Sequence, residues 1–356
     1  MAAQVTNYQC PACTGPLQFA SDSGKLACEY CGSSFEVAEI EAMFAQKEEK
    51  AEDAWHAENA GGSWSEEEAA GMRAYSCPSC GAEIVCDETT AATSCVYCGN
   101  PTVVPGQFSG NLKPDYVIPF KLDKDAAVQA LKNYYKGKVF LPKAFASANH
   151  ISKIKGVYVP FWLFNGQVEC SANYNASNSR TYTSGDYRIT ETDHFHVHRA
   201  GTFVFERVPA DGSSKMPDKH MDSIEPFDYS ELKPFSTAYL PGYLADKYDV
   251  SAEESAKRVN ERIRGSASDL LRRTVVTYQS VLEQNTNVSI KKGDIKYALL
   301  PVWMLHTKWQ EKDYLFAMNG QTGKLIGDLP VSKGKFAAWM AGIALPLMAI
   351  LALLLF

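Results

Sequence analysis

Two sets of four cysteines near the N-terminus constrain the fold of this chain most strongly. Each set consists of two CxxC pairs that are separated by fourteen residues. Two residues between cysteines allow one tight turn to point both sulfurs at a metal ion, and the second pair completes a tetrahedral shell of thiolates. The sequence therefore predicts two metal sites, whose ligands are Cys10, Cys13, Cys28 and Cys31 in one and Cys77, Cys80, Cys95 and Cys98 in the other.

The four-thiolate shell also predicts what the metal does. A filled tetrahedron leaves no position for water or substrate, so we expect two structural Zn²⁺ sites that perform no reaction. Iron of the rubredoxin type and redox-active dithiols are the alternatives. Gly32, Gly81 and Gly99 each directly follow a ligand, where the turn often requires a backbone conformation that other residues rarely adopt.

The two cysteine sets belong to a duplicated module. Tyr8 recurs as Tyr75, and all four cysteines of the first set recur at the same offset of 67 residues. We therefore expect a first zinc ribbon over residues 1–36 and a second over residues 75–104. Neither a basic leader nor an apolar signal segment occurs in the first ten residues, MAAQVTNYQC, and CxxC metal sites are typical of reducing compartments. We expect the ribbons to lie in the cytoplasm.

Charge is distributed unevenly along the chain. Of the 41 acidic and 35 basic residues in total, 16 acidic and 4 basic residues fall within residues 1–110, which gives a net charge of -12 there and +6 in the remainder. Affinity for nucleic acid comes mainly from Lys and Arg that neutralise phosphates. The acidic ribbon region therefore disfavours binding to nucleic acid.

The C-terminal segment has the composition of a membrane span. Residues 336–356 include no charged residue, and a helix of this length crosses the hydrocarbon layer of a bilayer, which is about 30 Å thick. Lys333 and Lys335 precede it, and positive residues stay on the cytoplasmic side. We expect a single transmembrane helix over 336–356 with the preceding body in the cytoplasm, ending either as a tail anchor or as a span cut short. A buried core helix is the alternative.

Residues 37–74 connect the two ribbons and are rich in Ala and Glu. Apolar residues recur there near helical spacing, which predicts an amphipathic helical linker. The apolar residues of this pattern are Val37, Ile40, Phe44, Ala51 and Trp55. The apolar side of this helix packs on the chain itself or binds a helix of a partner.

Residues 111–330 combine helical patterns with short runs rich in aromatic and β-branched residues. Asp123 and Ser251 are suitable N-caps for two helices. The run VYVPFWL at 157–163 resembles ALLPVWM at 298–304, with Pro and Trp in register. We expect an α+β body of helices packed on antiparallel sheets, with two related units over about 111–208 and 239–330. The prolines indicate edge strands or bulges, and residues 314–328 resemble a hairpin.

Patterns typical of catalysis are weak. His194, His196 and His198 alternate along one predicted strand, and neighbours on one face of a strand lie too far apart to converge readily on one ion. The sequence GQTGK at 320–324 is too short for a phosphate loop, and neither HExxH nor GxSxG occurs. Cys86 and Cys170 have no CxxC partner and are expected to be buried. We therefore predict that the chain is not an enzyme.

The residues also support a resemblance to a known family. The paired YxCPxC motifs resemble TFIIB-type zinc ribbons, which are also called zinc fingers of the TFIIB type. Together with YVPFW at 158–162, SIEPFDY at 223–229, FAMNGQTGK at 316–324 and the apolar tail, they make the chain similar to the YdjG-like bacterial membrane proteins. Members of that family are often mislabelled as a primosomal helicase, a name that this chain, which lacks a nucleotide-binding loop, does not support.

The resemblance has implications for function. Some members of the family are similar to proteins encoded beside phage-shock protein A and an SPFH (flotillin-like) protein. This implies a scaffold in an envelope-stress or membrane-maintenance complex, with those two proteins as partners. We therefore expect a membrane-anchored zinc-ribbon adaptor that binds protein partners. A zinc-ribbon protein that binds nucleic acid is the alternative.

Overall fold

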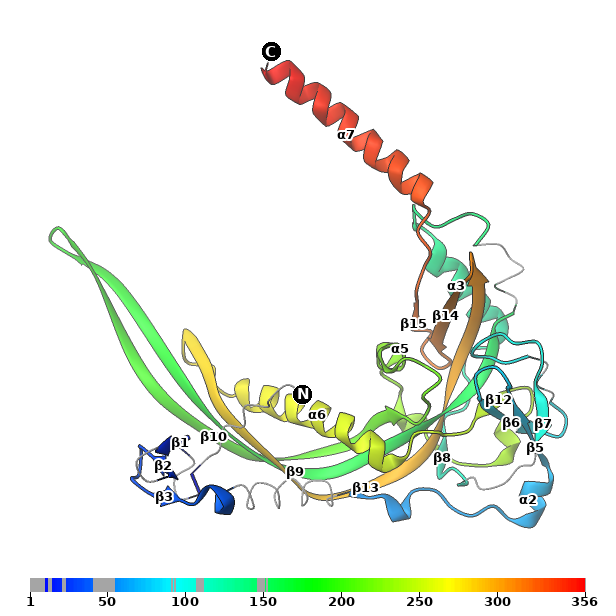
Figure 1. The fold of residues 1–356 in the computed structure, drawn as a ribbon, viewed down its shortest axis with the longest axis horizontal. Coiled ribbons are helices and arrows are strands. Elements are labelled where there is room, and N and C mark those ends of the chain that lie inside the picture. The colour runs from blue at the N-terminus through cyan, green and yellow to red at the C-terminus, as the bar shows by residue number, and fades with distance from the viewer. Residues whose placement is uncertain are drawn as a thin grey trace. The chain divides into compact units, whose positions relative to one another are not determined.

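The computed structural model describes residues 10–11, 15–20, 24–40, 55–90, 92, 94–106, 112–145, 151 and 153–355 (Figure 1). The chain forms two compact units. The first consists of Met1–His56, Gly166–Val204 and Arg264–Gly293, and the second of Ala57–Asn165, Phe205–Ile263 and Asp294–Phe356.

The first unit includes a small antiparallel sheet that carries part of the first cysteine set, since Cys28 ends one of its strands. In this sheet β1 (Leu17–Ala20) pairs with β2 (Lys25–Cys28), which pairs with β3 (Ser34–Phe35). The strand β4 (Trp55–His56) and parts of four longer elements belong to the same unit. Those longer elements are β9 (Lys155–Ser184), β10 (Tyr187–Asp211), α6 (Ala252–Arg272) and β13 (Ser280–Trp309).

The large sheet has the strand order β11-β8-β13-β9-β12-β6-β5-β7. In addition, β10 pairs with β9, and β14 pairs with both β13 and β15. The shorter strands are β5 (Met72–Ser76), β6 (Glu83–Asp87), β7 (Val104–Gly106), β8 (Tyr116–Val117), β11 (Lys233–Pro234), β12 (Leu244–Asp246), β14 (Lys312–Asn319) and β15 (Leu325–Gly327). The remaining helices are η1 (Ala57–Asn59), α2 (Glu66–Ala70), α3 (Lys124–Tyr135), α5 (Asp218–Ile224), η2 (Tyr229–Glu231), η3 (Thr237–Tyr239) and α7 (Lys333–Leu355).

The sheet is mixed, so the expectation of antiparallel sheets alone is wrong. β12 runs parallel to β9, and β8 runs parallel to β13. The fold is therefore mixed α/β, with large sheets and few helices. Residues 55–74 also differ from the predicted helical linker, because they form β4, η1, α2 and the start of β5. From Met72 onward the segment pairs with β6, which holds it in the sheet; residues 41–54 lie outside the described residues.

Both faces of β13 are buried over residues 297–305, which explains why this part of its sequence is apolar without alternation. Leu300, Val302 and Met304 face one core, where they pack with residues of β9 and α5. Trp303 and Leu305 face a second core, which includes Leu131 of α3. β9 and β13 therefore lie inside the sheet, so of the two expectations for their prolines, edge strands or bulges, the first is wrong.

Each of these prolines faces a glycine on the next segment of chain. Gly320 donates its amide hydrogen to the carbonyl oxygen of Pro301 (2.8 Å), and Gly212 does the same to Pro160 (2.8 Å). Proline has no N–H to return the bond, so the glycine carbonyl needs other donors. Those donors come from a third segment: Lys121 and Leu122 for Gly320, and Asp249 and Val250 for Gly212.

The tryptophan two residues after each proline holds the same third segment. Trp303 Nε1 donates to the carbonyl oxygen of Leu122 (3.0 Å), and Trp162 Nε1 donates to that of Val250 (3.0 Å). Phe120 and Tyr248 pack edge to face on these two indoles, each with ring centroids 5.2 Å apart. We call each set of proline, tryptophan, glycine and third-segment residues an interlock.

The helices that follow the interlocks begin at the predicted N-caps. Asp123 Oδ1 accepts a hydrogen bond from the amide of Ala126 (2.8 Å) at the start of α3. Ser251 and Glu254 form a reciprocal capping box at the start of α6 (2.9 and 3.2 Å). The strand preceding each helix pairs with the long strand of the same interlock: β8, before α3, pairs with β13, and β12, before α6, pairs with β9.

The two motifs SIEPFDY and NGQTG lie against each other. The side-chain amide of Asn319 donates to the carbonyl oxygens of Ile224 (3.0 Å) and Pro226 (3.3 Å). Gln321 Oε1 accepts from the amide of Asp228 (2.7 Å), and Gln321 Nε2 donates to the carbonyl oxygen of Asp228 (3.1 Å). The pairing of β14 with β15 confirms the predicted hairpin. The residues of its turn, Asn319 and Gln321, bind the SIEPFDY motif.

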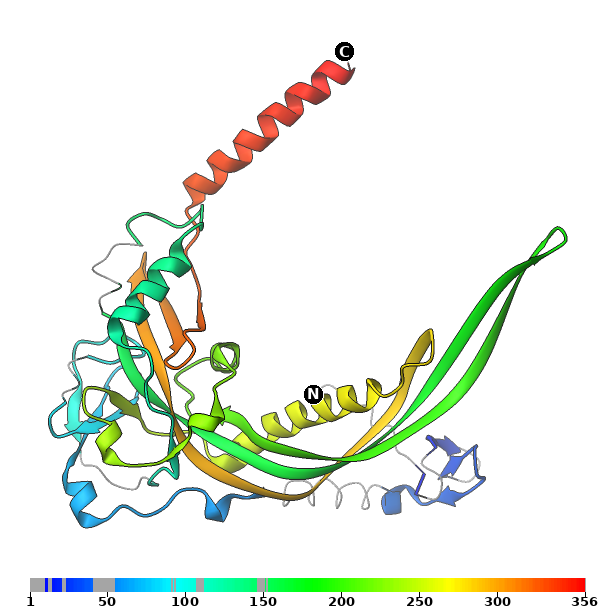
Figure 2. The same cartoon turned by 180° about the vertical axis from the view of Figure 1, so that it is seen from behind.

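The C-terminal helix α7 extends away from the sheet of its unit (Figure 2). The candidate membrane span Lys333–Ala352 is 20 residues long, and none of it is buried. Large apolar side chains such as Leu345 (62% exposed) and Leu354 (81% exposed) therefore face outward.

The interlocks lead to a prediction for two glycines. A Cβ at position 320 would lie 2.8 Å from the ring of Phe120 and 2.9 Å from Pro301 Cβ, and a Cβ at position 212 would lie 3.0 Å from Trp162 Nε1. We expect Gly320→Ala and Gly212→Ala to lower the free energy of unfolding by about 1–3 kcal/mol, measured by urea denaturation followed by tryptophan fluorescence.

The matched control is Gly265→Ala on α6, where a Cβ meets nothing within 4 Å. This change should stabilise the chain by up to about 1 kcal/mol, because alanine favours the helix. Equal effects of all three substitutions would show that the close approaches at positions 212 and 320 do not matter.

Candidate metal centres

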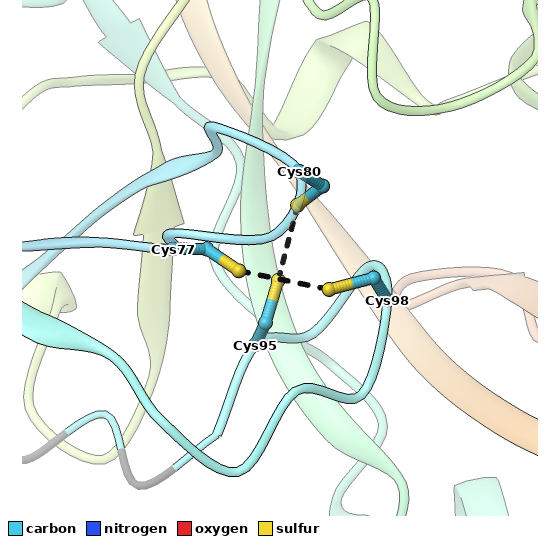
Figure 3. Close-up of side chains that lie close together, drawn as sticks. All are labelled: Cys77, Cys80, Cys95 and Cys98. Carbon is cyan, nitrogen blue, oxygen red and sulfur yellow. Dashed lines mark hydrogen bonds between the residues drawn. The ribbon is translucent and has the colours of Figure 1, made fainter.

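The four sulfurs of the second cluster, defined as Cys77, Cys80, Cys95 and Cys98, converge on one point (Figure 3). All four Sγ atoms lie within 4.8 Å of one another, and two of the separations, Cys77 to Cys98 and Cys80 to Cys95, are 3.6 Å. A disulfide would require about 2.05 Å. A tetrahedron with metal–sulfur bonds of about 2.3 Å has edges of about 3.8 Å, so the cluster fits a tetrahedral metal ion.

Backbone hydrogen bonds shape each turn that carries these cysteines. The amide of Cys77 donates to the carbonyl oxygen of Ala82 (2.9 Å), and the amide of Gly81 donates back to Cys77 (2.9 Å). Cys95 repeats the pattern with Asn100 (2.9 Å) and Gly99 (3.2 Å). The glycines after the ligands have positive φ, +72° at Gly32, +72° at Gly81 and +69° at Gly99, as the sequence predicted.

The first cluster, defined as Cys10, Cys28 and Cys31, has the same local geometry. Their three sulfurs lie within 4.8 Å of one another, and Cys10 and Cys31 are 3.6 Å apart. The fourth predicted ligand, Cys13, lies outside the described residues. Cys10 and Cys28 are buried whereas Cys31 is exposed, so this cluster lies closer to the surface than the second.

The second cluster belongs to the core of its unit. Cys77 and Cys95 are each 2% exposed and pack with apolar residues of β9 and β13. The hairpin of β5 and β6 precedes the second CxxC pair, and β6 pairs with β12 through Ala245 and Asp246. Two of its cysteines are therefore enclosed by the apolar side chains that hold the large sheet, while Cys80 and Cys98 are partly buried at the edge of this core.

A buried carboxylate lies beside this cluster. Asp246 Oδ2 accepts hydrogen bonds from the hydroxyl of Tyr97 (2.5 Å), which lies between two ligands in the sequence, and from Ser213 Oγ (2.6 Å). Burial raises the pKa of Asp246 to about 7 and raises that of Tyr97 far above its usual range. Sequence reasoning missed Asp246 and Ser213, because no local pattern distinguishes them from other loop residues.

The electrostatics of the cluster suit a bound cation. Burial alone would raise the pKa of the Cys77 thiol, but the amides of Cys80 and Ser79 and the Cys98 thiol lower it to about 7. Burial raises the pKa of Cys80 and of Cys95, so the four thiols cannot all ionise readily without a metal. A divalent ion would supply the charge that makes four thiolates stable.

Lysines lie on the open side of the second cluster. A pocket of about 600 Å³ beside Cys95 and Cys98 is lined in part by Lys124, Lys153, Lys155 and Lys308. Lys155 Nζ donates to the carbonyl oxygen and to Oγ of Ser94 (3.0 and 2.7 Å), and burial lowers its pKa. Four thiolates around a divalent ion carry a net charge of about -2, which these lysines would offset.

The other candidates from the sequence do not form a site among the described residues. His194, His196 and His198 are exposed on β10, and within the described ranges only the two cysteine clusters bring three or more ligand atoms within 4.8 Å. Cys86 is fully buried and its Sγ donates to the carbonyl oxygen of Thr90 (3.0 Å). Cys170 is buried too, and burial raises the pKa of both thiols.

Comparison with known proteins identifies one extended similarity. The chain is 37% identical over 340 residues to the "Uncharacterized protein YdjG" of Bacillus subtilis (strain 168), and the match covers 96% of this chain and 94% of that protein. No family model matches the chain. No solved structure matches it.

The two clusters lead to different predictions for metal loss. We expect two zinc ions per chain by elemental mass spectrometry, and one fewer in both Cys28→Ser and Cys80→Ser. Because the second cluster is part of the core, Cys80→Ser should also lower the unfolding temperature by about 10 °C or more. Cys28→Ser should leave the main unfolding transition unchanged.

Cys170→Ser is the control, since this buried cysteine belongs to neither cluster. It should retain both zinc ions. Loss of zinc in this variant, or full zinc content in Cys80→Ser, would contradict the assignment of the ligands.

Asp246 leads to a prediction for pH. The folded chain holds a proton on this group up to about pH 7, whereas an unfolded chain releases it near pH 4. The folded chain therefore binds more protons than the unfolded chain between these two pKa values, so the stability that Asp246 contributes is fully present below about pH 4 and is lost as pH rises through 7. Between pH 6 and 8 this loss should be about 1 kcal/mol, and it should disappear in Asp246→Asn.

Urea denaturation at several pH values measures this slope. Glu253→Gln removes an exposed carboxylate on α6 and should keep the slope of the unsubstituted chain. An unchanged slope in Asp246→Asn would show that Asp246 is ionised throughout this range.

Proposed function

The chain belongs to the YdjG family, and we propose that it is a membrane-anchored zinc-ribbon adaptor whose ribbons face the bacterial cytoplasm. In this proposal both cysteine clusters hold structural zinc, and α7 crosses the cytoplasmic membrane once. The adaptor links protein partners to the membrane and catalyses no reaction.

The observation that carries the proposal is the exposure of α7. A core helix of a soluble protein would be covered by the rest of the chain, but no part of the span Lys333–Ala352 is buried. Exposing this much apolar surface to water is unfavourable, which favours a lipid environment. Lys333 and Lys335 before the span support a cytoplasmic position for the preceding units.

The sulfur geometry supports zinc as the metal. Separations of 3.6 Å match the edge of a tetrahedral site, and four thiolates leave no open position for a substrate. Such a site stabilises the local fold and catalyses no reaction, which agrees with a protein whose role is to bind partners.

The first cluster is the better candidate for the partner-binding head. Two exposed aromatic side chains lie beside it: Phe19 on β1 (61% exposed) and Tyr30 in the turn between β2 and β3 (78% exposed). Exposed aromatic residues are enriched at protein interfaces. The second cluster has its sulfurs in a core, which suits an architectural role.

Proteins similar to phage-shock protein A and to SPFH (flotillin-like) proteins are the partners that the family resemblance suggests. Both classes would meet the adaptor at the membrane surface. The alternative, a nucleic-acid binder, is disfavoured by the net charge of -12 over residues 1–110, because phosphate contacts need Lys and Arg.

Capture of partners by the full-length protein in detergent tests the proposal. The double variant Phe19→Ala and Tyr30→Ala should retain both zinc ions and remain in the membrane fraction. It should lose most of the co-purified protein if these aromatic residues are hot spots, because truncating a hot spot costs about 1 kcal/mol or more, about a factor of five in affinity.

The matched control replaces another exposed apolar residue, Val104→Ala on β7, which is 50% exposed. This control should keep every partner. Unchanged capture by the double variant would contradict the role given to the first cluster, and retention on DNA at about 150 mM salt would favour the nucleic-acid alternative.

A further inference from the structure

The loop that follows α3 packs against the first turns of α7. The ring of Phe140 lies 5.5 Å from the ring of Phe336 and 5.6 Å from that of Trp339, edge to face in both cases. Figure 1 shows this loop, in teal, at the base of the red α7. Phe336 and Trp339 belong to the apolar part of α7, so a bilayer that surrounds this part of the helix must also meet Phe140.

Hydrogen bonds fix the loop to the start of the helix. The amide of Ser332 donates to the carbonyl oxygen of Phe140 (2.8 Å), and Lys335 Nζ donates to that of Leu141 (2.7 Å). Leu141 (7% exposed) and Phe145 (1% exposed) anchor the other end of the loop in the core beside α3. The loop therefore holds a set position relative to α7.

The tip of the loop is apolar and exposed. Val139 is 62% exposed, directly before the phenylalanine that contacts α7. A single exposed β-branched side chain is common on protein surfaces, but Val139 is next in sequence to Phe140, whose ring packs on α7. The loop therefore brings two apolar residues close to the base of the apolar helix.

Lysines are the only charged residues in the two stretches of sequence that include the loop and α7. Residues 126–145 and 329–356 contain no Asp or Glu. They contain six lysines: Lys132, Lys136, Lys138, Lys143, Lys333 and Lys335. Juxtamembrane lysines attract anionic headgroups, and their apolar stems can lie along the interface while the ammonium groups reach the phosphates.

We propose that the loop 136–143 is a second membrane-contact element, which inserts Val139 and Phe140 into the interface of a leaflet that contains anionic phospholipids. This inference rests on the proposed function, because it requires α7 to be in the bilayer. It adds a lateral contact beside the helix, which would fix how the body is oriented on the membrane surface.

Photocrosslinking of the full-length protein in vesicles tests this contact. p-Benzoylphenylalanine replaces Val139, Leu345 or Val104 in separate variants, and lipid adducts are measured by mass spectrometry. All three side chains are at least half exposed, so the replacement should not disturb packing. Position 139 should form lipid adducts several-fold more often than position 104, with position 345 as the positive control for α7.

Vesicles of phosphatidylcholine and phosphatidylglycerol in equal amounts test the preference for anionic lipid. Adducts at position 139 should be enriched in phosphatidylglycerol by about threefold or more over phosphatidylcholine. The triple change Lys136→Gln, Lys138→Gln and Lys143→Gln should remove this enrichment. The control, the same change at Lys233, Lys247 and Lys257, alters the net charge equally and should preserve it.

The outcomes separate the inference from the proposed function. Lipid adducts at 345 with none above background at 139 would overturn the loop contact and leave the anchor intact. An absence of adducts at 345 would overturn the anchor itself. Adducts at 139 without enrichment in phosphatidylglycerol, or enrichment that survives the loop triple change, would overturn the role of the lysines.

Discussion

The two interlocks are the contacts on which the rest of the second unit depends. In each, a proline in a central strand leaves a glycine carbonyl without a ladder partner, and two amides from a third segment fill the gap. The tryptophan that follows then binds the same segment through its indole N–H. Since each third segment leads directly into a helix, one set of contacts fixes a strand, a crossing glycine and a helix start.

The interlocks also exchange strands between the two halves of the body. β8 precedes α3 but pairs with β13, while β12 precedes α6 but pairs with β9. Each half of the body sequence (111–208 and 239–330) thus supplies a short strand that pairs with the long strand of the other half. The second cysteine cluster depends on this exchange, because β6 pairs with β12, and Tyr97 bonds to Asp246 at the end of β12.

Several features could be predicted from local residue patterns, and others could not. The ligand cysteines, the glycines with positive φ and the caps at Asp123 and Ser251 depend on a few neighbouring residues, so spacing alone reveals them. The strand at Trp55 was missed because apolar residues recur at helical spacing in the segment 37–74. In the structure, Trp55 and the residues from Met72 onward form strands that pair in the sheet. The prolines suggested edge strands because a proline cannot donate a backbone hydrogen bond to a neighbouring strand. The amides that bind the facing glycine carbonyls instead come from residues far away in the sequence, which a local pattern does not show.

The sequence by itself determined the two sets of converging thiols, the long apolar C-terminal segment and the duplicated Pro-x-Trp runs, since each is set by spacing or composition over short distances. Only the tertiary structure decided that the two sets have different surroundings, with Cys31 of the first exposed and the second enclosed in a core with β9 and β13. It also decided that the loop after α3 supports α7 and that Asp246 becomes a buried acid. These depend on strand pairing and burial between distant segments, which local patterns do not encode.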